Sequence, residues 1–383
     1  MSYTSAFCTR SEMVPCKNLP VEGLHLVALD IGYSAVKGFS STSRFCFPSF
    51  VKKITGTMVG APKPMDIYYQ GEDGDIYAVG SMAQMGLTSR DTNDATNTLF
   101  GRNRYDTPAF LILARVGLAL GLGKADCKEE RPLFLQTGLP PAYRKADTPL
   151  LKDALGGEHE FSVKIGTGDW RHFSFTLNPS NISVIDQPIG SVYSATKRSD
   201  GTTILCDDGQ TYIDKQLLVL DGGFGTLDVF SITNRHIDNS NTFNDLGMKA
   251  IFEGVSNDVF NLYGKEVHPH TMQRCLADGH ISILDRKTRT TTTQDLTEIL
   301  ERNNRKVFET AMAKIEAAYD NLEDFDYLLV TGGTGAAWFD MLQERYKGMS
   351  TLHIISGNQN EKMAPIYNNV RGYYIYRAIL SQK

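Results

Sequence analysis

The stretch Leu24–Lys37, LHLVALDIGYSAVK, is an apolar run that ends at Asp30 and turns at Gly32. A second stretch, Leu217–Asp228 (LLVLDGGFGTLD), repeats this pattern, and a third, Asp326–Ala337 (DYLLVTGGTGAA), ends a similar run in small residues. Short apolar runs bounded by turn residues are typical of buried strands. The repeat of a strand that ends in aspartate indicates an architecture of two related halves.

The residues that follow the two aspartates suit phosphate binding. Glycine permits turns with positive φ and lets backbone N–H groups approach an anion closely. A single Asp-x-Gly sequence is also common in ordinary β-turns, whereas two such turns, each at the end of an apolar strand, favour a nucleotide site. The glycines that the pattern assigns to these loops are Gly32, Gly222, Gly223 and Gly225.

Polar side chains beside these turns supply the remaining groups of a phosphate site. Asp30 and Asp221 are candidates to hold a hydrated Mg²⁺, which typically meets protein through one or two carboxylates. Lys37 is placed to reach a phosphate as a point charge, with a solvent-facing lysine as the alternative. The hydroxyls of Ser34 and Thr226 suit phosphate oxygens, although Ser34 could equally stabilise its turn.

A further candidate is the side chain that would orient an attacking water. Hydrolysis of a terminal phosphate needs in-line placement of water more than covalent help. Gln187 follows a predicted strand and begins a predicted helix, and simple capping or strand-end hydrogen bonding is its alternative role. Asp186 is a weaker candidate or a helix cap. The turn Thr331–Gly335 would let a nucleobase and α-phosphate lie against the backbone.

Composition restricts the function classes. A chain of 383 residues favours two domains, and its net charge of -5 lacks a basic block, which argues against direct nucleic-acid binding. Six scattered cysteines predict neither a zinc site nor a disulfide framework, and no apolar run is long enough to cross a bilayer. We expect a cytoplasmic protein without membrane association. The P-loop pattern G-x-x-x-x-G-K-[ST] is absent from the sequence.

The ordered motifs resemble the actin and heat-shock ATPase superfamily, and within it the ParM (StbA) plasmid-segregation actins of bacteria. The likeness spans about residues 24–380 and follows the family's order of first phosphate, connecting, second phosphate and adenosine motifs. Supporting pieces lie between and after them. The matching stretches are Asp30–Lys37, Gln187–Ala195, Asp221–Asp228 and Thr331–Gly335, with Phe47–Ser49, Tyr77–Ala83, Thr137–Pro140 and Asn369–Tyr374 in support.

The resemblance implies an α/β, actin-like fold of two RNase-H-like domains, each with a smaller subdomain, and a nucleotide in the interdomain cleft. Combined with the pattern, it predicts a flexible extension at 1–23. Domain I is expected at 24–195 plus 356–383, with an inserted subdomain at about 44–100. Domain II is expected at 196–355, with a helical subdomain at about 247–325. We also expect a threonine-rich solvated loop at 286–297 that opens a long helix to about Leu322.

The resemblance also implies an activity. The chain would hydrolyse ATP, or GTP, with Mg²⁺, assemble with itself into dynamic filaments and segregate plasmid DNA through a DNA-bound adaptor of the ParR type. Asp30 and Asp221 would hold the metal through water, and Gln187 would place the attacking water. The expected nucleotide contacts are Gly32, Tyr33, Ser34, Lys37, Gly222, Gly223, Phe224, Gly225, Thr226, Gly332, Gly333 and Thr334.

Three departures from the family pattern concern hydrolysis and assembly more than the fold. Gln187 stands where many such chains carry glutamate, the N-terminal extension is longer than usual, and residues 197–215 lengthen the connection to the second domain. The alternatives are a small-molecule kinase of the same superfamily, with Asp186 as its catalytic carboxylate, and a nucleotide-binding scaffold that does not polymerise.

Overall fold

The computed structural model describes residues 3–56, 60–87, 102–125, 131–359 and 363–382. The chain forms two compact units. The first unit is Arg10–Asp214 with Ser356–Lys383, and the second unit is Met1–Thr9 with Lys215–Ile355. Residues 196–214, which the sequence assigned to domain II, therefore belong to the first unit, where they form short bridges such as Lys197 with Thr203.

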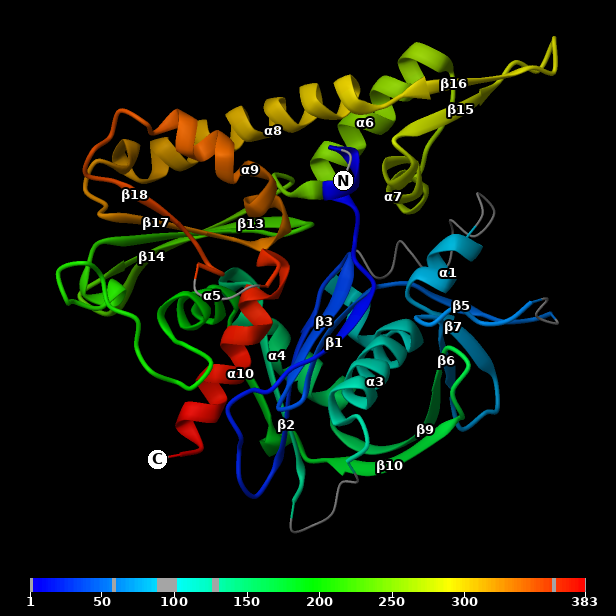
Figure 1. Ribbon diagram of the computed structural model, residues 1–383, viewed down its shortest axis with the longest axis horizontal. Coiled ribbons are helices and arrows are strands. Elements are labelled where there is room, and N and C mark those ends of the chain that lie inside the picture. Colours follow the sequence, from blue (N-terminus) through cyan, green and yellow to red (C-terminus); the bar gives the residue numbers. More distant parts are fainter. Residues whose placement is uncertain (1–2, 57–59, 88–101, 126–130, 360–362, 383) are drawn as a thin grey trace. The chain divides into compact units, whose positions relative to one another are not determined.

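The first unit is built on a six-stranded mixed sheet (Figure 1). The first four strands across this sheet pair antiparallel with their neighbours. The last three strands, which begin with the fourth, run parallel to one another. In spatial order the strands are β1 (Glu12–Pro15), β4 (Ser43–Pro48), β3 (Ala35–Ser40), β2 (His25–Ile31), β8 (Leu133–Leu139) and β11 (Ile182–Asp186).

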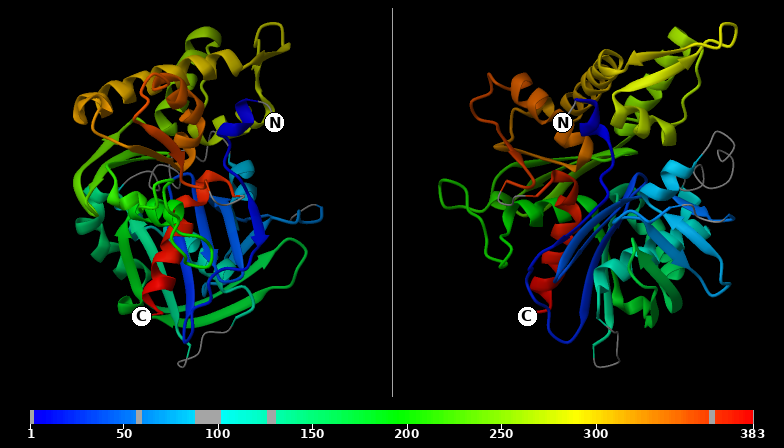
Figure 2. Two further views of the ribbon diagram at one scale, coloured as in Figure 1. Left: turned by 60° about the vertical axis from the view of Figure 1, so that its left-hand side comes forward. Right: turned by 45° about the vertical axis from the view of Figure 1, so that its right-hand side comes forward.

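Strand β2 is buried on both faces because helices cover both sides of the sheet (Figures 1 and 2). Val27 and Leu29 pack into one core with α3 (Pro108–Leu122), and Ala28 packs into a separate core with α10 (Asn368–Leu380). Successive strand residues point to opposite faces, so a near-continuous apolar run is needed here. This burial fixes Asp30 at the end of a rigid strand.

Helix α5 (Gln187–Thr196) crosses α10 at two glycines. A Cβ on Gly372 would lie 1.6 Å from the Gly190 carbonyl oxygen, so both positions require glycine for backbone contact. Nearby, buried Arg371 donates from Nη1 to the Ser194 carbonyl (2.7 Å). The close crossing holds α5, and with it Gln187, against the main sheet.

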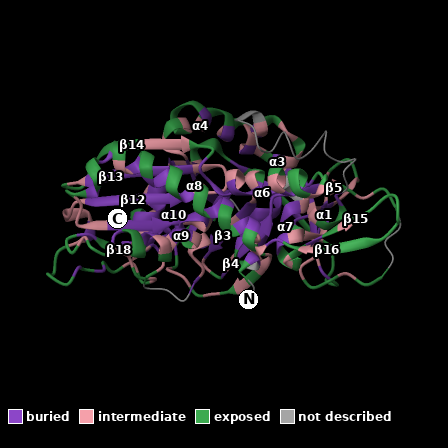
Figure 3. Ribbon diagram, turned by 90° about the horizontal axis from the view of Figure 1, so that it is seen from above, coloured by how far each residue is buried: buried purple, intermediate pink, exposed green. Residues whose placement is uncertain are grey.

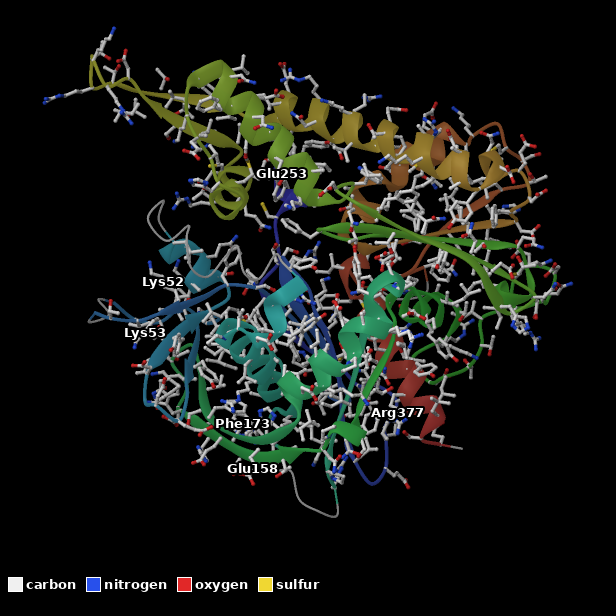
Figure 4. All side chains as sticks on the ribbon, turned by 180° about the vertical axis from the view of Figure 1, so that it is seen from behind. Lys52, Lys53, Glu158, Phe173, Glu253 and Arg377 are labelled. Atoms are coloured by element: carbon white, nitrogen blue, oxygen red, sulfur yellow. The ribbon has the colours of Figure 1, made fainter. Side chains whose placement is uncertain are left out.

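A second, five-stranded sheet lies in the first unit, with exposed Lys53 on one edge strand (Figure 4). The prediction of an inserted subdomain at 44–100 missed two of its strands, which come from later in the chain. Arg115 of α3 joins the sheet to the main core by donating to Tyr69 Oη (2.9 Å) and His159 Nδ1 (3.1 Å). The strands are β10 (Arg171–Leu177), β9 (Gly157–Ile165), β6 (Ile67–Gln70), β7 (Ile76–Val79) and β5 (Val51–Lys53). The short helix α1 (Ser81–Gly86) follows β7, and α4 (Pro141–Leu155) follows β8.

The second unit contains a five-stranded sheet whose buried residues pack with four helices. In spatial order its strands are β14 (His236–Asn244), β13 (Thr226–Thr233), β12 (Leu217–Gly222), β17 (Tyr327–Thr331) and β18 (His353–Ser356). The helices are α6 (Met248–Tyr263), α7 (Pro269–Asp278), α8 (Thr297–Ala318) and α9 (Gly332–Arg345). A separate hairpin, β15 (His280–Leu284) with β16 (Thr291–Asp295), has an exposed second strand (Figure 3).

Two predicted segments differ from the structure. The extension expected to be flexible includes the 3₁₀ turn Thr4–Phe7, whose Phe7 is buried in the core of the second unit, and β1, which pairs with β4. The threonine run forms β16 instead of a loop, and α8 ends at Ala318 instead of near Leu322. Contacts with residues far away in the sequence determine the structure of both segments, and the local composition does not reveal these contacts.

Among the described helices, none is long and apolar enough to cross a membrane.

We predict that Gly372→Ala destabilises the first unit by at least about 3 kcal/mol, because the added methyl group meets backbone that cannot move away cheaply. Denaturant unfolding measures this change in the free energy of unfolding. Gly56→Ala, at a position with open space around its Cβ, is the control and should change stability little. Equal effects of the two substitutions would contradict the crossing described above.

Candidate functional site

The first candidate loop connects β2 to β3 and is closed by hydrogen bonds. The Gly32 N–H donates to the Ala35 carbonyl (3.0 Å). Buried Ser49 holds the same loop from outside, since its hydroxyl donates to the Gly32 carbonyl (2.7 Å) and its N–H to the Ser34 carbonyl (3.0 Å). Ser49 belongs to a motif that supports the family resemblance, but no role was predicted for its side chain.

Asp30 and Lys37 form a cross-strand ion pair beside this loop. They are direct partners in the β2–β3 register, and Lys37 Nζ donates to Asp30 Oδ2 at 2.8 Å. Only 20% of the Lys37 side chain and 6% of the Asp30 side chain are exposed. The alternative of a solvent-facing lysine is therefore wrong. The pair neutralises a carboxylate that would be costly to bury alone.

An arginine absent from the predicted site packs on the first loop. The Arg104 guanidinium carbon lies 4.7 Å from the ring centre of Tyr33 and 5.4 Å from those of Tyr105 and Phe110. Tyr105 Oη in turn donates to buried Asp147 (3.3 Å), and burial raises the pKa of Tyr105 to about 12. The stacked guanidinium thus ties the loop to the start of α3.

Gln187 and Asp186 lie at the junction of β11 and α5, as predicted. Asp186 does not cap the helix with its side chain; it accepts a hydrogen bond from Arg144 Nε of α4 (2.5 Å). Within the described ranges, the Gln187 amide has no hydrogen-bond partner. The Asp186 carboxylate, by contrast, is already in an ion pair with Arg144.

The second candidate loop connects β12 to β13 and abuts the N-terminus of α6. The Gly223 N–H donates to the Thr226 carbonyl (2.9 Å), and the Phe224 carbonyl accepts from the Lys249 N–H (2.8 Å). A Cβ on Gly247 would lie 2.5 Å from the Phe224 oxygen, so glycine is required where the helix begins. Backbone hydrogen bonds therefore bind the loop to the helix, and the Phe224 ring packs edge-on against Phe252 of α6, with ring centres 5.8 Å apart.

The third predicted turn packs directly against the second loop. Gly332 has φ +79°, and a Cβ there would lie 2.3 Å from the Gly222 oxygen and 2.7 Å from Asp221 Oδ1. Thr334 Oγ1 donates to the Gly223 carbonyl (2.6 Å). Sequence positions more than a hundred residues apart are thus in contact within the second unit. Gly333 follows in the first turn of α9, and Gly225 and Thr226 lie in the second loop and at the start of β13.

Asp228 is a buried residue that the predicted site did not include. It is the cross-strand partner of Asp221, and it accepts hydrogen bonds from Thr242 (2.6 Å) and Thr226 (3.1 Å). Burial, aided by the Asp221 charge, raises the pKa of Asp228 to about 7. The spacing of the two aspartates around the turn is a signal that could have revealed the pair.

The donor set of the second loop fits a hydrated Mg²⁺. Two buried carboxylates on neighbouring strands repel each other, and a cation would relieve that repulsion. Mg²⁺ keeps several waters and needs only one or two protein carboxylates. A closed metal cage of three or more His, Cys, Asp or Glu side chains is absent from the described part of the chain. Asp30 is less suited than Asp221, because Lys37 already neutralises it.

The comparisons with known proteins identify the fold. Residues 28–190 match the family model of the actin-like proteins' N-terminal domain. A non-polymerisable quadruple mutant of pCBH ParM is similar over 92% of this chain and 98% of its own, with a TM-score of 0.69 and 19% identity. A 15-stranded ParM filament from Clostridium botulinum is similar over 94% and 99% (TM-score 0.68, 18% identity). An archaeal actin homologue, Ta0583, in complex with ADP matches over 92% and 99% (TM-score 0.63, 16% identity). No curated protein matches by sequence. The predicted actin-like α/β fold is confirmed.

We predict an energetic coupling between Arg104 and Tyr33. Arg104→Ala and Tyr33→Ala should each lower the free energy of unfolding, and the double variant should lose about 0.5–2 kcal/mol less than their sum, as expected for a cation–π contact. Denaturant unfolding of the four proteins measures the coupling. Tyr33→Phe keeps the ring and should preserve it. Strict additivity would show that the two side chains do not stabilise one another.

We also predict that Asp228→Asn changes how stability depends on pH. The folded carboxyl keeps its proton up to about pH 7, whereas the unfolded one loses it near pH 4, so wild-type stability falls as the pH rises between these values. The variant should therefore gain roughly 2–4 kcal/mol relative to wild type between pH 4 and pH 8. Thermal or denaturant unfolding at both pH values tests this, with exposed Asp238→Asn as the control. The same difference at both pH values would refute the raised pKa.

Proposed function

The chain is an actin-like protein with the fold of the ParM-type actin homologues, and we propose that it is a Mg²⁺-dependent ATPase that polymerises into dynamic filaments. In this proposal the filaments segregate plasmid DNA in the cytoplasm through a DNA-bound adaptor of the ParR type. The observation that carries the proposal is the duplicated strand end: each unit presents a buried aspartate followed by a closed, glycine-containing loop.

We propose that one nucleotide engages both loops. Backbone N–H groups of the two loops would bind the phosphates, except those of Gly32 and Gly223, which already donate to the hydrogen bonds that close the loops. Lys37 would be a further cation. Asp221, supported by Asp228, would hold Mg²⁺ through water, with Asp30 as a further carboxylate, and the metal would neutralise charge on the phosphates when bound. The base would lie against the turn at Gly332, Gly333 and Thr334. The proposed phosphate contacts are Gly32, Tyr33, Ser34, Gly222, Gly223, Phe224, Gly225 and Thr226.

Gln187 is proposed to orient the attacking water. Its amide can both donate to and accept from water, and it is fixed at the first turn of a helix that is itself anchored at Gly190. An amide cannot take the water's proton as a carboxylate can, so this residue would position water without acting as a general base. A Gln187→Ala variant, which lacks this amide, should therefore hydrolyse nucleotide more slowly and form longer-lived filaments.

Helix α6 is the proposed location of ribose contacts. It begins at the second loop, and its first turns carry Lys249 and Glu253, an ion pair at 3.6 Å (Figure 4). Both side chains are partly exposed and can offer a donor and an acceptor to sugar hydroxyls. The ADP bound by the archaeal homologue Ta0583 supports an adenine nucleotide over a guanine nucleotide.

Assembly and partners rest on comparison and charge. The Clostridium botulinum ParM and Alp12 structures are filaments, which supports self-association here. The net charge of -5 supports an adaptor over direct DNA contact. The kinase alternative needs a free carboxylate near the phosphates, and Asp186 is already bound by Arg144.

Light scattering with simultaneous phosphate release tests the proposal. Purified protein with Mg²⁺ and ATP should scatter more light as filaments form, and the signal should decay as phosphate appears. ADP should give no lasting rise, and GTP measures base preference. Nucleotide binding and phosphate release without scattering would instead favour a soluble ATPase, or a kinase if an acceptor became phosphorylated. Binding with neither effect would favour a non-polymerising scaffold.

Two substitutions separate the proposed roles. Asp221→Ala should reduce Mg²⁺-dependent turnover at least about a hundredfold, because it removes a charge that organises the metal. Gln187→Ala should slow hydrolysis about tenfold or more with nucleotide affinity nearly unchanged. Asp238→Ala, at an exposed position of the same sheet as Asp221, is the control. Wild-type phosphate release from Asp221→Ala, or an equal loss of affinity and turnover in Gln187→Ala, would overturn the assigned roles.

A further inference from the structure

A basic turn forms the end of the β15–β16 hairpin, which leads into the N-terminal end of α8 (Figure 1). Arg286, Lys287 and Arg289 are all exposed in this turn. The only acidic residue in the turn, Asp285, accepts hydrogen bonds from the backbone N–H groups of Lys287 (2.8 Å) and Thr288 (3.2 Å). In the described chain, none of the three basic side chains has a carboxylate at ion-pair distance. Their charge therefore faces solvent.

An acidic turn follows the other end of α8. Asp320, Glu323 and Asp324 are exposed, and none of these carboxylates forms an ion pair with a described residue. The turn has a defined shape: Asp320, Asn321 and Leu322 have φ values of 45°, 53° and 64°, and the Leu322 side chain is buried. Residues other than glycine adopt these positive φ values only at a cost in conformational energy. The defined backbone conformation of this turn therefore fixes the positions from which the acidic side chains extend.

The acidic turn follows the C-terminal end of α8, and the basic turn is the tip of the hairpin whose second strand, β16, leads into the N-terminal end of the same helix. Helix α8 has 22 residues, which corresponds to about 33 Å. The helix dipole places partial negative charge at the C-terminal end of α8, next to the acidic turn. Acidic residues at a helix C-terminus are unfavourable in an isolated chain, because they repel this dipole. A cationic partner at that end would offset the repulsion.

We propose that the basic turn (Arg286, Lys287, Arg289) of one copy docks on the acidic turn (Asp320, Glu323, Asp324) of the next copy. Complementary patches at separate places on one unit, the hairpin tip and the C-terminal end of α8, give a head-to-tail contact, which extends into an open filament when it does not close into a ring. Exposed charge pairs of this kind set the association rate and the register of the contact. The inference rests on the proposed filament function and assigns one of its subunit contacts.

Charge reversal tests the contact. Arg286→Glu with Lys287→Glu reverses the basic turn, and Glu323→Lys with Asp324→Lys reverses the acidic one. Each double variant should raise the critical concentration for assembly at least about tenfold, because attraction becomes repulsion. The quadruple variant restores complementarity and should assemble within about threefold of wild type. Arg305→Glu with Lys306→Glu, which changes the same charge on the exposed middle of α8, is the control and should leave assembly nearly unchanged. Nucleotide affinity should be unaffected in all variants.

Zero-length carbodiimide cross-linking distinguishes failure of this contact from failure of filament formation. A link between Lys287 of one copy and Glu323 or Asp324 of another, found by mass spectrometry in linear oligomers, is the expected result. Oligomers that lack this link, or no rescue in the quadruple variant, would overturn the contact and leave the filament proposal standing. No oligomers in any nucleotide state would overturn both proposals. Tight binding of duplex DNA that the basic-turn variant loses, without an effect on assembly, would assign the turn to nucleic acid instead.

Discussion

The second loop depends on backbone contacts that a side chain would prevent. Gly222, Gly247 and Gly332 each lie where a Cβ would come within about 2.5 Å of backbone atoms of a neighbouring segment. Three segments distant in the chain therefore meet without side chains between them: the end of β12, the start of α6 and the start of α9. The same constraint appears in the first unit, where Gly190 and Gly372 let α5 and α10 touch. This packing fixes the backbone of the second loop, and the Gly223 N–H is already used to close it.

The two loops share a backbone plan but differ in charge. In the first, Lys37 neutralises Asp30 across the strand pair, and Arg104 stacks on Tyr33. In the second, Asp221 faces another buried carboxylate, Asp228. A bound cation would be stabilised more strongly at the second loop, next to the two carboxylates. A bound phosphate would be stabilised more strongly at the first loop, which carries the basic residues. This difference in charge between the loops is the physical reason for proposing a nucleotide bound with Mg²⁺ as the ligand.

The sequence predicted the strands that carry the loops because each is a long apolar run that ends at a glycine turn. Strands β2, β12 and β17 end within about one residue of the expected aspartate or threonine. Segments whose structure depends on distant partners were missed: the docked N-terminus, the threonine strand β16 and the late strands β9 and β10. The roles of Ser49, Arg104 and Asp228 were missed for the same reason, since each follows from register or packing across the unit.

We propose that a single nucleotide binds to the loops of both units. Isothermal titration calorimetry with Mg²⁺ and a non-hydrolysable ATP analogue tests it most directly, in wild type and in one variant of each unit, Lys37→Met and Gly332→Val. We expect one nucleotide per chain and a large loss of affinity in both variants. Two nucleotides per chain, or a loss confined to one variant, would contradict it.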